Sequence, residues 1–96
     1  MIQSFADAFS QEIFDGVKNA RTRSFPADVL PVAYRKLLVL SAAAALSDLA
    51  TPPGNRLEAL RGTLKGFHSI RINSQWRIVF RWTSAGPADV KITDYH

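Results

Sequence analysis

WRIVFRW, residues 76–82, is the stretch of the chain that decides the fold. Apolar side chains occupy its even positions, which are Trp76, Ile78, Phe80 and Trp82. Because side chains along a β-strand alternate between two faces, this period predicts a strand with one face in the core. The same alternation places Arg77 and Arg81 on the opposite face, away from the core.

Weaker strand patterns flank this stretch on both sides. Phe67–Ile72 precedes it across a tight turn, and Val90–Asp94 follows it after an expected loop at Ser84–Asp89. Leu57–Arg61, which a glycine ends, predicts one more strand. Short strands joined by short connections favour an antiparallel meander.

The start of the chain has mainly helical periodicity. Ile2–Phe5 alternates apolar and polar residues and predicts a short first strand. Apolar residues at helical spacing then predict a helix over Ala6–Gly16. Lys18–Ser24 is basic and lacks a period, so we expect a mobile loop with its arginines exposed.

The main helix is expected to open at Pro26 or at Asp28 and to run to about Ala45. Asp28 is a good N-cap residue, and Pro31 then falls in the first turn, where its missing N–H costs little. We expect two basic side chains of this helix to face solvent, Arg35 and Lys36. The stretch Thr51–Asn55 (TPPGN) breaks the pattern before the strands begin.

Together these patterns predict one α+β domain over residues 1–96, in the order β-α-α-β-β-β-β. Two helices would cover one face of a small antiparallel sheet. The other face would be open to water and would expose Arg77 and Arg81.

Composition narrows the function classes. The chain lacks cysteine and has two histidines, which argues against a disulfide framework, a thiolate metal site or a classical zinc site. We see neither a bilayer-length apolar run nor a signal peptide at the first residues, so we expect a cytoplasmic protein that does not act at a membrane. The formal net charge of +4 falls entirely in residues 51–96, which favours a polyanionic partner such as nucleic acid.

No nucleotide-binding loop, zinc-protease motif or nucleophile elbow is present. One candidate catalytic cluster remains: Arg77, Asp94, Tyr95 and His96. Metal-independent RNA cleavage needs a base, an acid and a fixed cation; histidine and arginine suit these roles. From position alone, these residues could also be a polar C-terminal tail and a surface arginine without any function. The identity of the base stays open.

The second half contains four distinctive motifs: NRLEALRG (55–62), SIRIN (69–73), QWRIVFRW (75–82) and the terminal DYH (94–96). Together these motifs resemble the HigB-type plasmid-maintenance killer proteins of the RelE/ParE toxin superfamily. The resemblance is dense over residues 52–96 and weaker but collinear over 1–51.

This resemblance implies a RelE-like fold and a ribosome-dependent endoribonuclease that cuts mRNA without a cofactor or a metal. It implies a HigA-type helix-turn-helix antitoxin as partner, with operator DNA contacted only through that antitoxin. Arg77 would stabilise the phosphate, and Asp94, Tyr95 and His96 would form the C-terminal catalytic group. We expect five further basic residues to bind RNA: Arg56, Arg61, Lys65, Arg71 and Arg81.

The sequence departs from some family members in the strand after the proline-rich loop. Glu58 and Arg61 stand where those members carry histidine and lysine. Arg61 can replace a phosphate-binding lysine, whereas Glu58 would repel phosphate unless it serves as an acid or base. Two alternatives stay open: a ParE-like poison of DNA gyrase, and a non-catalytic module that binds its antitoxin and helps repress their promoter.

Overall fold

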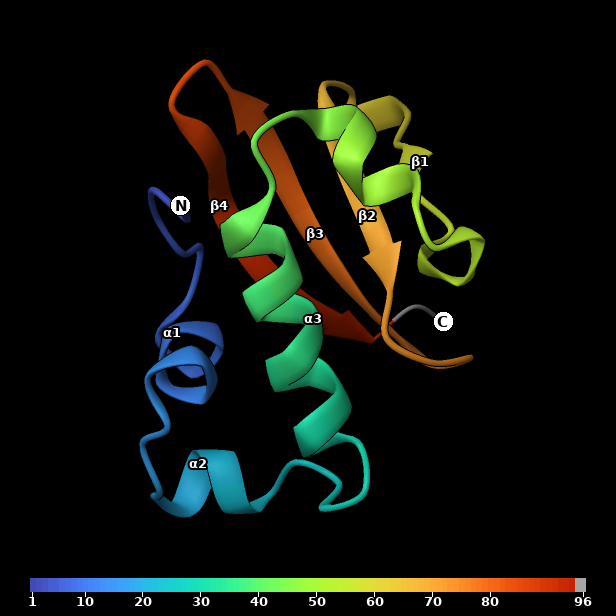
Figure 1. Cartoon of the computed structure of the whole chain (residues 1–96). Helices are drawn as coiled ribbons and strands as arrows, with labels where there is room; N and C mark the ends of the chain where they lie inside the picture. The colour runs from blue at the N-terminus through green and yellow to red at the C-terminus, as the bar shows by residue number, and fades with distance from the viewer. Residues whose placement is uncertain (95–96) are drawn as a thin grey trace.

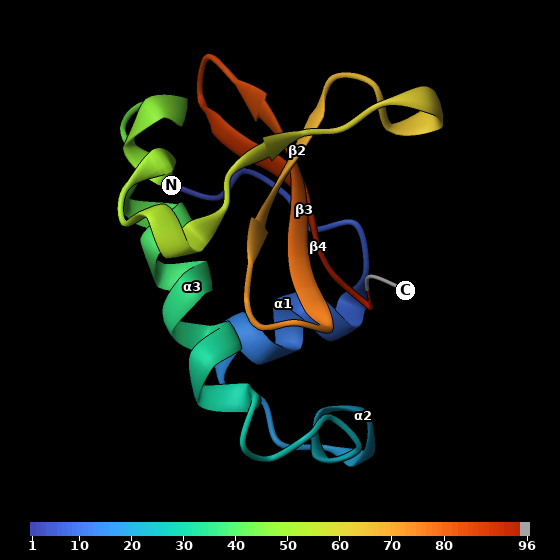
Figure 2. The same cartoon turned by 90° about the vertical axis from the view of Figure 1, so that its right-hand side faces the viewer.

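The computed structural model describes residues 1–94, which form a four-stranded antiparallel sheet of order β1-β2-β3-β4. The strands are β1 (Glu58–Ala59), β2 (Phe67–Arg71), β3 (Trp76–Thr83) and β4 (Gly86–Asp94). The α-helices are α1 (Ala8–Asp15), α2 (Ala20–Arg23) and α3 (Leu30–Ala42), and 3-10 turns occupy Leu46–Ala50, Pro53–Asn55 and Gly62–Leu64. α3 lies across one face of the sheet, and α1 packs beside it next to β4 (Figure 1; Figure 2). The predicted α+β class is confirmed.

The register of β3 fixes which residues share a face of the sheet. Ile78 lies opposite Ile70 of β2, and both side chains are fully buried under the helices. Arg77, one residue earlier, lies opposite Arg71 of β2 and Thr93 of β4 on the other face. The alternation predicted from WRIVFRW is therefore confirmed.

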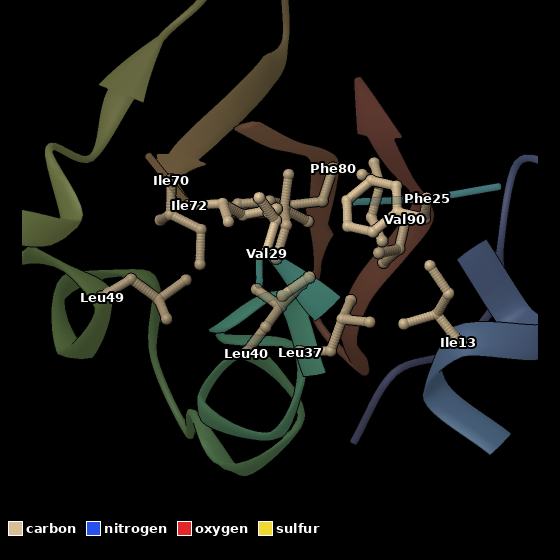
Figure 3. Packing of buried hydrophobic residues seen from close by; sticks show 13 residues of the cluster. Ile13, Phe25, Val29, Leu37, Leu40, Leu49, Ile70, Ile72, Phe80 and Val90 are labelled. Carbon is tan, nitrogen blue, oxygen red and sulfur yellow. The ribbon is translucent and has the colours of Figure 1, made fainter. Parts of the chain in front are cut away.

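The hydrophobic core joins the helices to the inner face of the sheet (Figure 3). Leu37 and Leu40 of α3 meet Phe80 of β3 and Val90 of β4 there, and all four side chains are fully buried. Both tryptophans of β3 pack against this cluster, as the even-position pattern predicts. Within residues 1–94, no helix combines the length and the apolar character that crossing a membrane requires.

The predicted first strand, Ile2–Phe5, is wrong in extent. Phe5 alone pairs with Val90, through an isolated parallel bridge. The backbone N–H of Gln3 donates to the carbonyl of Pro87 at 2.7 Å. Because proline has no N–H to return, the ladder cannot continue past this point.

The predicted loop at Lys18–Ser24 contains a short helix, α2. The Asn19 side chain accepts from the Thr22 N–H at 3.0 Å, and Thr22 Oγ1 accepts from the Asn19 N–H at 3.0 Å. This reciprocal capping stabilises a helical turn that has no hydrophobic period to reveal it. Arg21 stays exposed, as predicted, and pairs with Glu12 of α1 at 2.7 Å.

The main helix is shorter than predicted at both ends. It begins at Leu30, and its N-cap residue, Val29, makes no side-chain cap, so Asp28 is not the cap. Pro31 does fall in the first turn. At the other end, Asp48 accepts from the backbone N–H groups of Ala44 and Ala45 at 2.9 and 3.0 Å, which holds these residues outside the helix.

The outer strands also differ from prediction. β1 keeps only two residues of the predicted strand Leu57–Arg61, because a 3-10 turn begins at Gly62. β4 begins at Gly86 instead of Val90, so most of the predicted loop Ser84–Asp89 is strand. Gly86 has φ of +132°, and a Cβ there would lie 2.5 Å from the Met1 carbonyl oxygen, so this tight entry requires glycine.

Candidate functional site

Arg77 projects from β3 on the face away from the helices, yet it is only 6% exposed. The prediction of a water-exposed Arg77 is therefore wrong, although its face is correct. Its Nε donates to Ser69 Oγ at 2.8 Å, and its Nη2 donates to the carbonyl of Arg56 at 2.6 Å. A guanidinium with two fixed partners is oriented before any ligand arrives, which is the preorganisation that anion stabilisation needs.

Arg77 is buried because the chain before β1 folds back over this end of the sheet. The 3-10 turn Pro53–Asn55 ends at Arg56, which adopts a left-handed conformation with φ 46° and ψ 55°. Its carbonyl thereby meets the guanidinium of Arg77. Glu58 of β1 follows, with its Oε1 4.0 Å from Arg77 Nη2.

A hollow of about 270 Å³ opens at this place, which we call the polar hollow. Its lining comprises Arg56, Glu58, Arg71, Asn73, Ser74 and Arg77. Three guanidinium groups against one carboxylate give the polar hollow a positive balance. Arginine binds two oxygens of one phosphate and keeps its charge at any physiological pH, so the arrangement suits a phosphodiester.

Four predicted site residues, Arg77, Arg71, Arg56 and Glu58, come together in the polar hollow. Arg61 and Lys65 are exposed on either side of the turn Gly62–Leu64 and do not line the polar hollow. Arg81 lies on the same sheet face but forms an ion pair with Asp89 at 3.1 Å, away from the hollow.

The C-terminal residues were predicted to meet Arg77. Asp94 lies opposite Trp76 in the sheet register, and its Oδ2 accepts from Gln75 Nε2 at 3.0 Å. Strand alternation assigns Asp94 to the Trp76 face at the rim of the sheet, whereas Arg77 is on the other face. Tyr95 and His96 lie outside the described residues. Asp94 ends β4 opposite Trp76, the first residue of β3, so it lies at the end of the sheet where Arg77 is also found.

Two residues of this region were missed by the sequence reasoning, Ser69 and Asn55, and both are fully buried. Ser69 of β2 accepts directly from Arg77 and lies opposite Val79 of β3. Strand alternation in β2 was the signal that could have placed Ser69 on this face. Asn55 Oδ1 accepts a hydrogen bond from Lys36 Nζ of α3. Lys36 is thus half-buried rather than solvent-facing as predicted, because it turns toward this amide.

Other features do not supply catalytic groups. A larger hollow of about 530 Å³ lies between α1, α2 and α3, and its lining is mostly apolar, as at Ile13, Phe25 and Leu30. It lacks the cluster of charges that phosphate chemistry needs. His68 stacks on Phe80 with ring centroids 6.2 Å apart. In residues 1–94, no three His, Cys, Asp or Glu side chains converge as metal ligands would.

Comparisons with known proteins agree with the sequence motifs. Residues 3–96 match a family model described as RelE-like toxin of type II toxin-antitoxin system HigB. Toxin HigB-1 of Vibrio cholerae is 44% identical over 82 residues, which cover 85% of this chain and 84% of that toxin. An uncharacterized protein of Haemophilus influenzae is 37% identical over 57 residues, covering 59% of this chain and 56% of its own.

The fold also has a counterpart among solved structures. A chain of the YoeB-YefM complex from Staphylococcus aureus superposes with a TM-score of 0.61, covering 100% of this chain and 98% of that one. At 14% sequence identity, this likeness supports the fold alone.

Proposed function

Because the chain belongs to the HigB-like family of RelE-like toxins of type II toxin–antitoxin systems, we propose that it is an endoribonuclease. Its substrate is mRNA on the ribosome, and its action in the cytoplasm slows growth. The observation that carries this proposal is the buried, oriented guanidinium of Arg77 at the wall of a hollow lined by three arginines.

The proposed reaction needs no metal and no cofactor. A base removes the proton of a ribose 2′-hydroxyl, whose oxygen attacks the adjacent phosphorus. The bond from phosphorus to the 5′-oxygen of the next nucleotide breaks, and an acid protonates that oxygen. The products are a 2′,3′-cyclic phosphate and a free 5′-hydroxyl, so atoms and charge balance.

Arg77 has the central role because negative charge grows on the phosphorane oxygens during this step. Its guanidinium already has fixed partners, so it need not reorganise when that charge appears. Arg56 and Arg71 line the same hollow and would hold the flanking phosphates. Arg61 and Lys65 would guide the RNA backbone from their exposed positions, and Arg81 would add long-range attraction.

The proposal has two candidate sources of proton transfer, one from the hollow and one from the sequence. Glu58 lies within the hollow, near Arg77, and can accept a proton as a carboxylate. The C-terminal group Asp94, Tyr95 and His96 offers the alternative, with histidine suited to transfer near neutral pH. In that case Asp94 supports its neighbours from the rim of the sheet.

Membership of a toxin–antitoxin family implies that an antitoxin is a partner of this chain. We propose a HigA-type antitoxin with a helix-turn-helix domain. Operator DNA would then be contacted through the antitoxin rather than by the toxin itself.

Expression of the chain without antitoxin, followed by mapping of new RNA 5′ ends, tests the proposal. We expect growth arrest and cuts within translated mRNA for the wild type, and neither for Arg77→Ala. Arg81→Ala is the matched control, because it removes an arginine from the same strand and face. Binding of purified Arg77→Ala to the antitoxin shows that it is folded. Undiminished cutting by folded Arg77→Ala, or arrest through loss of DNA supercoiling without new RNA ends, would overturn the proposal.

A further inference from the structure

We propose that Lys36 and Asn55 are positioning residues, which act through the Arg56 carbonyl to set the orientation of Arg77. We call this pair the anchor. The inference rests on the proposed ribonuclease function and deepens it. It extends the site from the sheet to α3, which lies on the opposite side of the fold from the polar hollow.

Asn55 ties three segments of the chain together. Its Nδ2 donates to the carbonyls of Leu49 and Thr51 at 3.2 and 3.3 Å, and its Oδ1 accepts from Lys36 Nζ. The residue is fully buried, so its amide groups depend on these partners. Figure 1 shows the path involved, from the end of α3 over the top of the molecule to β1. Asn55 pins this path shortly before β1.

Lys36 is placed unusually for a lysine on a helix. Such side chains normally extend their ammonium into water, but this one points at a buried amide. Burial, followed by the charge of neighbouring Arg35, lowers the pKa of Lys36. An ammonium kept in this setting indicates a specific contact, not a solvated charge.

The residue after Asn55 has a conformation that needs such support. Arg56 is left-handed, with φ 46°, a region that residues with a side chain seldom adopt and keep only when their surroundings hold them there. Two sets of contacts hold the peptide group between Asn55 and Arg56. The Arg56 N–H donates to the Pro53 carbonyl at 3.1 Å, and the side chain of Asn55 is fixed by its own hydrogen bonds. The Arg56 carbonyl is consequently directed at Arg77 Nη2, 2.6 Å away.

Arg77 is therefore held from two directions. Ser69 fixes Nε from within the sheet, and the Arg56 carbonyl fixes Nη2 from the covering turn. Loss of the anchor would weaken the Arg56 contact and leave the bonds to Ser69, which run from Nε to Oγ and, at 3.4 Å, from Nη2 to the carbonyl, so the guanidinium would be held less tightly on the side of the covering turn. Such a change would reduce the rate of the chemical step more than the binding of RNA, since other basic residues and the ribosome also hold the RNA.

The experiment compares Lys36→Met with Arg35→Met in the full chain. Methionine keeps the unbranched stem but cannot donate to Asn55, and Arg35→Met removes the same charge from the adjacent, exposed position. Cleavage of ribosome-bound mRNA is measured at increasing toxin concentration, which separates the maximal rate from half-saturation. Lys36→Arg, which can still donate, is the conservative rescue. The second readout is the ¹⁵N–¹H signal of Arg77 Nε, assigned by its loss in Arg77→Lys.

For Lys36→Met, we expect the maximal rate to fall about 10- to 100-fold, as for a small misplacement of a catalytic group, while half-saturation changes little. The Arg77 Nε signal should shift or broaden. Arg35→Met and Lys36→Arg should each resemble the wild type in both readouts. An unshifted Arg77 signal would overturn the anchor, and so would a shifted signal with wild-type cleavage or an equal loss in Arg35→Met.

The two proposals fail in distinguishable ways. If folded Arg77→Ala still cleaves RNA, the proposed function of Arg77 fails. The ¹⁵N–¹H signal of Arg77 requires no RNA, so it still reports whether Lys36 sets the guanidinium orientation.

Discussion

Replacing Arg77 by lysine would keep the positive charge and remove the guanidinium fork. At present Nε bonds Ser69 Oγ at 2.8 Å and Nη2 bonds the Arg56 carbonyl at 2.6 Å. A lysine ammonium can take over one of these contacts, so one buried acceptor loses its partner. A hydrogen bond to a charged group contributes about 1.5–3 kcal/mol, and we expect a stability loss of about 2 kcal/mol. In a domain of this size the melting temperature then falls by about 8–16 °C.

The effect on cleavage should exceed the effect on stability. Lysine offers a point charge, whereas arginine presents two parallel N–H groups to one phosphate. Loss of one preorganised donor to a developing oxyanion commonly costs about 10²–10³-fold in rate. We therefore expect Arg77→Lys to cleave RNA about 10²-fold more slowly, or slower still, at a temperature where it is fully folded.

The assay is single-turnover cleavage of ribosome-bound mRNA, with circular dichroism to show that each variant is folded. Arg81→Lys is the matched control, because its side chain is 47% exposed and its partner is Asp89 on the surface. Because Arg81 lies outside the polar hollow and lysine keeps its charge, Arg81→Lys should cleave RNA at close to the wild-type rate. A folded Arg77→Lys variant that cleaves at the wild-type rate would refute the reasoning, as would an equal loss in Arg81→Lys.

Three further predictions concern the core, an ion pair and the hollow. Leu37→Ala removes a fully buried side chain of α3 and should lower the free energy of unfolding by about 2–5 kcal/mol in urea titrations; a loss well under 1 kcal/mol would contradict the packing described. The hydrogen bond from Arg21 lowers the pKa of Glu12 below its ordinary value. The pair therefore stabilises the fold at any pH above the ordinary pKa of the carboxyl group, and this contribution is lost as the pH falls through the lowered pKa. Urea midpoints across this acidic range should therefore depend less on pH in Glu12→Gln, and an unchanged pH dependence would count against the pair. Glu58→Gln removes the carboxylate from the polar hollow and should tighten binding of a non-cleavable 2′-deoxy RNA analogue in fluorescence anisotropy, whereas weaker binding would show that Glu58 does not oppose phosphate.

Much of the sheet was predictable because its signal is local. In β3, the alternation of apolar side chains with Arg77, Val79 and Arg81 identifies both the strand and its two faces. The burial of Arg77 was not predictable in this way. It depends on the turn at Arg56, which folds back over the sheet from more than twenty positions away in sequence, and no period encodes that contact.

Short capped elements are hard to predict from sequence for a different reason. α2 is held by the side chains of Asn19 and Thr22, and the end of α3 is set by Asp48. Each of these features depends on one or two side-chain hydrogen bonds, and so few residues do not form a periodic pattern in the sequence. The pair Asn19 and Thr22, three residues apart, was nevertheless a readable cap.

The candidate site was predictable in part. The strand pattern and the family resemblance point to Arg77, and Arg56 and Arg71 are among the five basic residues predicted to bind RNA. Ser69 and Asn55 were overlooked because uncharged side chains gain their importance from what they contact in the fold. Helix periodicity predicts a solvent-facing Lys36, because it cannot show that a long side chain turns back toward a buried amide.

The most direct test of the central claim uses a ribosome-bound mRNA with a single 2′-deoxynucleotide on the 5′ side of a mapped cut. The claim is that the polar hollow promotes attack by the 2′-hydroxyl on its neighbouring phosphate. Purified wild-type chain should cut the all-ribose message at this bond and leave the substituted bond intact. Cleavage of the substituted bond at an undiminished rate would contradict the account.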